Sequence, residues 1–146
     1  VLDGDDAVYI ARSGAHRHMN TGYMLGSRIQ AQLSTAGVAI LAGMGEAASD
    51  AWLAARELRP FTPFTIASKE QLRNELQRFR RQGWALLEQQ LELNARGIAV
   101  PLLDRNNTVQ GAISITMPIN QEKSEDAIQR VLPVLQEAAR SLRPLI

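Results

Sequence analysis

Two apolar runs flank an asparagine-rich turn in the second half of the sequence, and they restrict the possible folds more than any other pattern. The first run leads from Gly97 to Asp104, the turn follows at residues 105–107, and the second run begins at Val109. Such an arrangement predicts a β-hairpin.

The second run alternates, so its residues divide between two faces of a strand. One face carries large apolar side chains and the other carries small or hydroxyl-bearing ones. The two sets are Ile113, Ile115 and Met117, and Ala112, Ser114 and Thr116. We expect the apolar face to contact a core, while the other face is either solvated or lines a cavity.

A helix is predicted to begin after Ser34 and Thr35. These hydroxyl residues precede an apolar segment, residues 36–42, which is followed by Gly43, and Ser or Thr at this place is typical of an N-cap. The first turn of a helix has unpaired backbone N–H groups and a partial positive charge, so it can hold a carboxylate without a charged side chain. The alternative is an ordinary capped helix without a ligand.

Three more helices are expected along the chain. One covers residues 46–56, and the next begins after the N-cap Ser68 and ends at Gly83. The last begins at Ser124, and Pro133 is expected to kink it or split it. Strands and helices in this order predict an α/β (α+β) fold in which helices pack on an antiparallel sheet.

The N-terminal residues predict a second hairpin. Asp3 and Gly4 form a turn dipeptide, and residues 7–12 read as the strand that follows it. Because only two residues precede the turn, we expect that the first strand of the domain is missing and that the chain is a fragment of a longer protein.

Residues 16–22 are expected to form another strand, on which His16 and His18 point the same way. Two histidines that bind one metal ion would have to point the same way, but no cysteine or nearby carboxylate completes such a metal site. We therefore predict no metal site and interpret these residues as solvated. Arg12 and Arg17 can pair with a carboxylate ligand or remain at the surface; whether Arg12, Arg17 or His18 reaches a ligand is left open.

Length and composition restrict the class of protein. A chain of 146 residues fits one domain, and a formal net charge of +1 does not indicate a dominant nucleic-acid footprint. No apolar stretch is long enough to span a membrane and no signal peptide opens the chain, so a cytoplasmic location is expected. No motif for catalysis or for phosphate or dinucleotide binding is present; neither an enzyme nor a cofactor is predicted.

Several short segments together resemble a known family. They are residues 83–104, with Gly-Ile-Ala-Val-Pro-Leu-Leu-Asp at their end, Gly-Ala-Ile-Ser-Ile-Thr at 111–116, Gly-Ser-Arg at 26–28, Ser-Thr-Ala-Gly at 34–37 and Thr-Pro-Phe-Thr at 62–65. In this order they resemble the C-terminal effector-binding domain of the IclR family of bacterial transcriptional regulators. The Thr-Pro-x-Thr segment, with Gln-Leu-Glu-Leu at 90–93, is similar to the subgroup that controls aromatic-acid breakdown through the β-ketoadipate pathway.

The resemblance implies a fold and partners. The fold would be a GAF-like or profilin-like antiparallel sheet flanked by helices, covering residues 1–146 as a single domain. A winged helix-turn-helix domain would precede it and make all contacts with DNA. The domain would bind a small organic acid, control DNA binding allosterically, and form a homodimer or tetramer.

The resemblance also implies the effector-binding residues. Backbone N–H groups of Thr35 and Ala36 would hold the acid, and the hydroxyls of Ser114 and Thr116 would line the cavity. Two further family positions fall on Leu87 and Gly97, where members that sense very small acids have an acidic residue and a cysteine. The apolar Leu87 and the small Gly97 favour an aromatic acid. The alternatives are a sensor of a non-aromatic acid and an oligomerisation module without a ligand.

Overall fold

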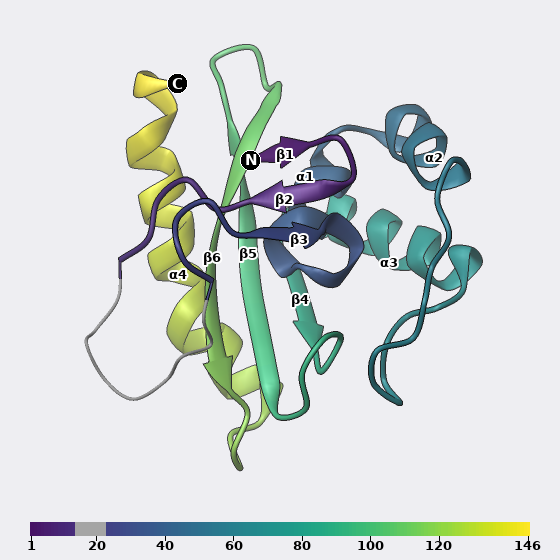
Figure 1. Ribbon diagram of the computed structural model, residues 1–146. Helices are drawn as coiled ribbons and strands as arrows, with labels where there is room; N and C mark the ends of the chain where they lie inside the picture. Colours follow the sequence, from purple (N-terminus) through teal and green to yellow (C-terminus); the bar gives the residue numbers. More distant parts are fainter. Residues whose placement is uncertain (14–22) are drawn as a thin grey trace.

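The structure is a computed structural model that describes residues 1–13 and 23–146 (Figure 1). The described chain contains two antiparallel three-stranded sheets, in the orders β1-β2-β3 and β4-β5-β6. The strands are β1 (Leu2–Asp3), β2 (Asp6–Val8), β3 (Arg28–Gln30), β4 (Ala85–Glu88), β5 (Ala95–Leu103) and β6 (Val109–Pro118). The helices are α1 (Thr35–Gly43), α2 (Glu46–Ala54), α3 (Lys69–Gln82) and α4 (Ser124–Leu142), with short 3-10 turns at Ala31–Leu33 and Arg143–Leu145. The expected α/β fold is confirmed, although its strands divide between two sheets.

The hairpin of β5 and β6 is the predicted one, and its turn is fixed by Asp104. The Asp104 carboxylate accepts hydrogen bonds from the backbone N–H groups of Asn106 at 2.8 Å and Thr108 at 2.9 Å. The hydrogen bond from Thr108 is the main cause that lowers the pKa of Asp104, which supports the ionised form in this turn. Asn107 has a φ of 62°, a conformation that asparagine tolerates well.

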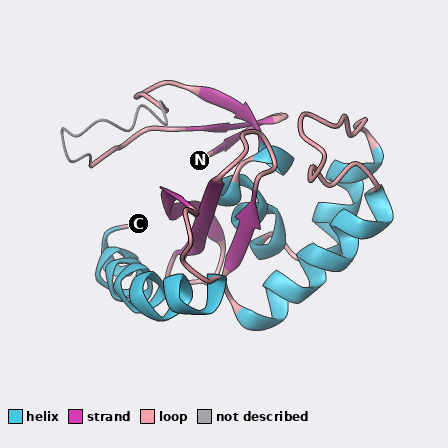
Figure 2. Ribbon diagram, turned by 90° about the horizontal axis from the view of Figure 1, so that it is seen from below, coloured by secondary structure: helices cyan, strands magenta, loops and turns pink. Residues whose placement is uncertain are grey.

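The two faces of this sheet are covered by different helices (Figure 2). Helix α4 packs on the face that carries Ile98 and Val100, together with Ile113 and Met117. Helices α1 and α3 cover the opposite face, where Ala112 packs against their buried residues. The predicted apolar face of β6 is therefore confirmed for Ile113 and Met117, whereas Ile115 is exposed and belongs to neither core cluster.

Helix α1 is the most enclosed helix, because it contacts β5 and β6, α3, and β2 of the small sheet. Its residues from Gly37 to Ala42 are all buried. The predicted N-cap is confirmed, since the Ser34 hydroxyl accepts a hydrogen bond from the Gly37 backbone N–H at 3.2 Å. A Cβ on Gly37 would lie 2.7 Å from the carbonyl carbon of Ala31, so only glycine allows α1 to start this close to the preceding turn.

The other predicted helices are present, with one difference. Ser68 caps α3 by accepting a hydrogen bond from the Gln71 backbone N–H, and Gly83 ends the helix with a φ of 85°. Pro133 was expected to kink or split the last helix; the split is wrong, because α4 is continuous from Ser124 to Leu142, and the kink stays a prediction. Pro133 is exposed, so water can solvate the carbonyl that its missing N–H leaves unpaired, while Val131 and Leu135 hold the helix on the sheet.

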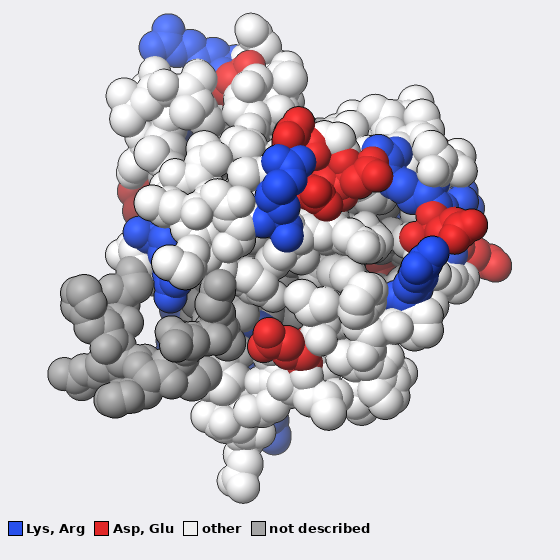
Figure 3. Space-filling view, viewed as in Figure 1, with Lys and Arg blue, Asp and Glu red and all other residues white. Residues whose placement is uncertain are grey.

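The small sheet confirms the hairpin at Asp3 and Gly4, where Gly4 has a φ of 62°. Its second strand is shorter than predicted and ends at Val8. Arg28 of β3 forms ion pairs with Asp3 at 2.9 Å and Asp6 at 3.1 Å. Figure 3 shows acidic and basic side chains side by side at this end of the molecule.

The strand expected at residues 16–22 and the predictions for His16, Arg17 and His18 fall on residues 14–22, outside the described part of the chain. Within the described residues, no helix is both long and apolar enough to cross a bilayer. The same residues contain no group of three histidine, aspartate or glutamate side chains placed to hold a metal ion.

Candidate functional site

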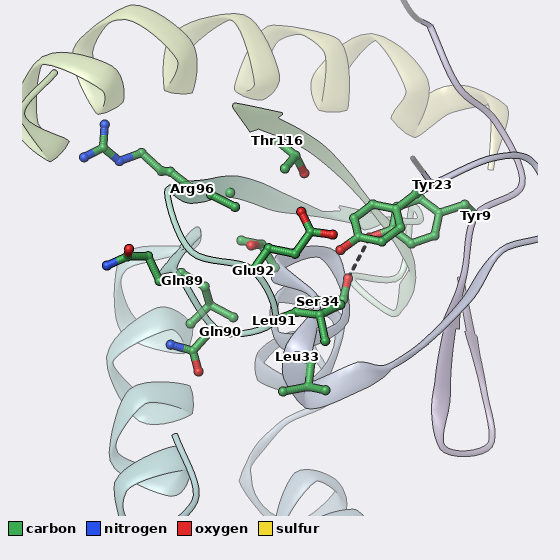
Figure 4. Close-up of a pocket in the computed structure, with 14 residues that line it drawn as sticks. Tyr9, Tyr23, Leu33, Ser34, Gln89, Gln90, Leu91, Glu92, Arg96 and Thr116 are labelled. Atoms are coloured by element: carbon green, nitrogen blue, oxygen red, sulfur yellow. Dashed lines mark hydrogen bonds between the residues drawn. The ribbon is translucent and has the colours of Figure 1, made fainter. Parts of the chain in front are cut away.

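A pocket lies where the start of α1 meets the β4–β5 loop and the segments that flank the small sheet (Figure 4). The space open to a water-sized sphere is about 40 Å³. Its lining residues are Tyr9, Tyr23, Leu33, Ser34, Thr35, Leu87, Gln89, Gln90, Leu91, Glu92, Ala95, Arg96, Gly97 and Thr116. Segments far apart in the sequence thus contribute an apolar floor, two aromatic rings and several polar groups.

The start of α1 offers hydrogen-bond donors to this pocket. The Ser34 hydroxyl accepts from the Gly37 N–H and also bonds the Tyr9 hydroxyl at 2.9 Å. Among the described residues, the backbone N–H groups of Thr35 and Ala36 have no hydrogen-bond partner. Two donors at the positive end of a helix are therefore available to an anion.

Two stacked tyrosines form one wall. The ring centroids of Tyr9 and Tyr23 are 5.1 Å apart and the ring planes differ by 16°. Burial raises the pKa of Tyr9, and it raises the pKa of Tyr23 to about 12, with smaller contributions from the charges of Tyr9 and Glu92. Both phenols are therefore neutral at pH 7 and can donate a hydrogen bond.

Thr35 packs directly on β5 at Gly97. A Cβ on Gly97 would lie 2.8 Å from the Thr35 Cβ and still closer to its hydroxyl oxygen. Gly97 was expected to favour an aromatic acid because it is small, and in the structure the Thr35 side chain occupies the space that a Cβ at Gly97 would take. Gly97 pairs with Thr116 across the hairpin, which brings the Thr116 side chain to the same pocket.

Four of the six predicted site residues meet at the pocket: Thr35, Leu87, Gly97 and Thr116 line it. Ala36 follows Thr35 in the first turn of α1, but it is not among the lining residues. Ser114 is not among them either, because it pairs with Ala99 two residues further along the hairpin. At this part of the hairpin α1 packs on both strands.

The rim of the pocket is held by the two segments that carried the subgroup resemblance. The hydroxyls of Thr62 and Thr65 donate to the carbonyl oxygens of Gln89 and Gln90, the latter at 2.6 Å. The Gln90 side chain, only 8% exposed, accepts from the Ile66 N–H at 2.8 Å. The Thr-Pro-Phe-Thr loop therefore fixes the loop that carries Gln89 to Glu92.

Two arginines near the pocket are bonded to other groups. Arg12 is exposed and donates to the Tyr23 carbonyl oxygen at 3.2 Å, and it is not a lining residue. Arg96 lines the pocket, but its guanidinium group is directed away from the tyrosines (Figure 4). That group is 3% exposed, pairs with Glu88 at 3.0 Å, and donates to the Glu122 carbonyl oxygen at 3.1 Å.

Sequence reasoning missed Tyr9, Tyr23 and Glu92. The two tyrosines are the only ones in the sequence, and aromatic side chains with a polar end are typical of binding surfaces. That signal was available but could not say where the rings lie. Glu92 stood within a segment used only for the resemblance.

The fold and the pocket define a class, namely an α/β domain with a pocket at the start of a helix. The chain belongs to the family described as bacterial transcriptional regulator IclR, C-terminal, whose model it matches over residues 1–143. It is 34% identical over 150 residues to the Pca operon regulatory protein of Acinetobacter baylyi, and the match covers 100% of this chain and 54% of that protein. The Pca regulon regulatory protein of Pseudomonas putida is 33% identical, with 97% of this chain and 49% of that protein covered.

One similar solved structure is the inducer-binding domain of a double mutant of the PobR transcription factor from Acinetobacter, in complex with 3-hydroxybenzoic acid. It superposes with a TM-score of 0.90 at 28% identity and covers 100% of this chain and 86% of that chain. The predicted family and fold are confirmed. The chain spans about half the length of the two curated relatives, which are regulators rather than enzymes.

Proposed function

We propose that the pocket binds a small aromatic carboxylic acid, and that the chain is the part of an IclR-type regulator that senses this effector. The observation that carries the proposal is the pair of unpartnered amides at the start of α1, beside a pocket walled by stacked tyrosines. The acid group of the effector would accept hydrogen bonds from the Thr35 and Ala36 N–H groups, where the helix dipole also favours a negative charge. The complex of a similar domain with 3-hydroxybenzoic acid supports an aromatic effector.

The remaining walls suit the ring of such an acid. Leu33, Leu87 and Leu91 supply apolar surface, and Tyr9 and Tyr23 supply aromatic faces. Ligand sites typically combine such walls with a few well-placed polar groups. The Thr116 hydroxyl is one such group on the sheet side.

Binding a ring requires the pocket to widen. The open space of about 40 Å³ is large enough only for water molecules, whereas a cavity that binds benzene has about 150 Å³. An effector therefore binds a wider arrangement of the rim than the one described. Because a ligand shifts an equilibrium toward the arrangement that it binds better, occupancy alters the conformation of the domain.

This change is the proposed signal. A helix-turn-helix domain in the rest of the regulator would bind DNA, and a homodimer or tetramer of effector domains would set the spacing of its DNA-binding units. The effector would favour one arrangement of that assembly over another.

A thermal-shift panel tests the proposal. The compounds are 3-hydroxybenzoate, 4-hydroxybenzoate, protocatechuate, β-ketoadipate and pyruvate. An effector at a hundred times its dissociation constant stabilises the fold by about 2.7 kcal/mol, which raises the Tm of a chain of this length by about 8 °C. A shift with the non-aromatic acids alone would establish a non-aromatic sensor, and no shift with any acid would indicate an oligomerisation module.

The position of the acid group is tested by Thr35→Pro with Thr35→Ala as the matched control. Proline is well tolerated at the first position of a helix and removes the backbone N–H, and Ser34 already has the extended conformation that proline requires of its predecessor. Loss of a hydrogen bond to a charged group lowers affinity about 10- to 100-fold. Thr35→Pro should show this loss relative to Thr35→Ala, and equal affinities would exclude the Thr35 amide as a ligand.

A second pair of variants tests the hydroxyls assigned from the sequence. Thr116→Val removes a hydroxyl from the pocket and should weaken binding, whereas Ser114→Ala changes a residue outside the lining set and should not. If Ser114→Ala weakens binding more than Thr116→Val, the effector lies deeper along the hairpin than we propose. Isothermal titration of both variants gives the comparison.

A further inference from the structure

Glu92 gives the pocket a negatively charged side chain. It lines the pocket, is exposed, and forms no ion pair among the described residues. In Figure 4 its carboxylate is directed toward Tyr9 and Tyr23 rather than away from the pocket. The contribution of its charge to the raised pKa of Tyr23 agrees with this placement.

No described cation offsets this charge inside the pocket. Arg96 is the only basic residue in the lining set, but its guanidinium group is directed away and is paired with Glu88 at 3.0 Å. The start of α1 also borders the pocket, through Ser34 and Thr35, and it has a partial positive charge and unpartnered N–H groups. Groups of opposite polarity therefore border the same pocket.

On the basis of the function proposed above, we propose that Glu92 determines which acids the pocket accepts. Its carboxylate accepts a hydrogen bond but donates none. An aromatic acid that carries a hydroxyl at its 3- or 4-position can place the acid group at α1 and donate the hydroxyl hydrogen to Glu92. A second carboxylate at that place meets a like charge for which the described residues supply no counter-ion, and this is unfavourable near a partly desolvated surface. The pocket thus selects hydroxy monocarboxylates and rejects dicarboxylates.

The test compares acids that differ only in this group. They are 3- and 4-hydroxybenzoate on one side, and isophthalate and terephthalate, in which a carboxylate replaces the hydroxyl at the same ring position, on the other. Affinities are measured by isothermal titration for the unaltered 146-residue chain, for Glu92→Gln, and for Glu57→Gln. Glu57 is 86% exposed at its side chain and does not line the pocket, so its variant makes the same charge change elsewhere.

We expect the unaltered chain to prefer each hydroxybenzoate over its dicarboxylate partner by at least about tenfold. Glu92→Gln should reduce this ratio about tenfold, mainly by tighter binding of the dicarboxylates, and Glu57→Gln should leave it unchanged. Added salt should reduce the ratio for the unaltered chain but not for Glu92→Gln, because salt screens the repulsion.

The outcomes separate the two proposals. If hydroxybenzoates bind but the ratio is the same in the unaltered chain and Glu92→Gln, the role of Glu92 is overturned and the proposed function stands. If the unaltered chain prefers the dicarboxylates, the role of Glu92 is likewise overturned and the proposed function stands. If none of the four acids binds the unaltered chain or either variant, both proposals fail.

Discussion

Replacement of Gly97 by alanine introduces a methyl group between β5 and the first residue of α1. The new Cβ would lie 2.8 Å from the Thr35 Cβ, inside the 3.4 Å at which ordinary contact begins, and closer still to the Thr35 hydroxyl. Rotation of the Thr35 side chain can move the hydroxyl but not the Cβ. The variant must therefore displace the start of α1 or bend the strand.

The expected loss of stability follows from the enclosed position of α1. Insertion of a methyl group into a well-packed core costs about 1–3 kcal/mol. With an unfolding entropy of about 2 cal/mol/K per residue, each kcal/mol lowers the Tm of a chain of this length by about 3 °C. Gly97→Ala should therefore lower the Tm by about 3–9 °C.

Denaturant and thermal unfolding measure the change, and Gly111→Ala is the matched control. Gly111 lies on the partner strand, and a Cβ there would meet only ordinary contact with Val1 at 3.5 Å, so this variant should change the stability by less than about 0.5 kcal/mol. A double-mutant cycle with Thr35→Gly isolates the clash, because that background lacks the opposing Cβ. If Gly97→Ala destabilises the chain equally in both backgrounds, contact with Thr35 is not the cause.

Three further predictions concern ionisable groups. Glu88→Gln leaves the buried Arg96 guanidinium, 3% exposed and 3.0 Å from Glu88, without its main partner. The variant should lower the free energy of unfolding by about 2–3 kcal/mol, which is more than Arg96→Met should lower it. Denaturant unfolding measures both variants, and a larger loss for Arg96→Met would contradict the prediction. The pKa values of the Tyr9 and Tyr23 phenols are raised, that of Tyr23 to about 12. The neutral phenols therefore stabilise the fold fully below pH 10, and this stabilisation is lost as the pH rises through the folded-state pKa values. Tyrosinate absorbance that appears before pH 10 would refute this prediction. The pKa of Asp104 is lowered, so its carboxylate stabilises the fold above the ordinary pKa of 3.8, and this stabilisation is lost as the pH falls further. Asp104→Asn should therefore flatten the fall in stability at acid pH. An unchanged fall in the variant would contradict the role of Asp104.

Much of the fold could be predicted because its signals are local. The N-caps at Ser34 and Ser68 and the αL glycine at Gly83 depend on hydrogen bonds within one turn of the chain. The continuity of α4 through Pro133 was not predictable in this way. It depends on Pro133 lying on the exposed side of a helix whose buried residues pack on the sheet, and that orientation is tertiary.

The site was predictable only in part for the same reason. Thr116 belongs to a strand with a clear alternating pattern, whereas Leu87 was assigned by resemblance alone. Tyr9 and Tyr23 reach the pocket from the ends of segments that flank the small sheet, and their stacking depends on tertiary contacts. Glu92 belongs to a loop whose position depends on hydrogen bonds to Thr62 and Thr65 through neighbouring residues. No local pattern carries that information.

Gly97 joins the stability of the fold to the geometry of the site. Its missing side chain lets Thr35 rest on β5, and this contact sets where α1 begins and where its unpartnered amides lie. A displaced Thr35 would shift those donors relative to the tyrosines, and hydrogen bonds to a carboxylate weaken steeply with poor geometry. Gly97→Ala should therefore weaken aromatic-acid binding as well as lower the Tm, whereas Gly111→Ala should change neither. A destabilised Gly97→Ala variant that binds the acid with unchanged affinity would show that the start of α1 does not hold the acid group.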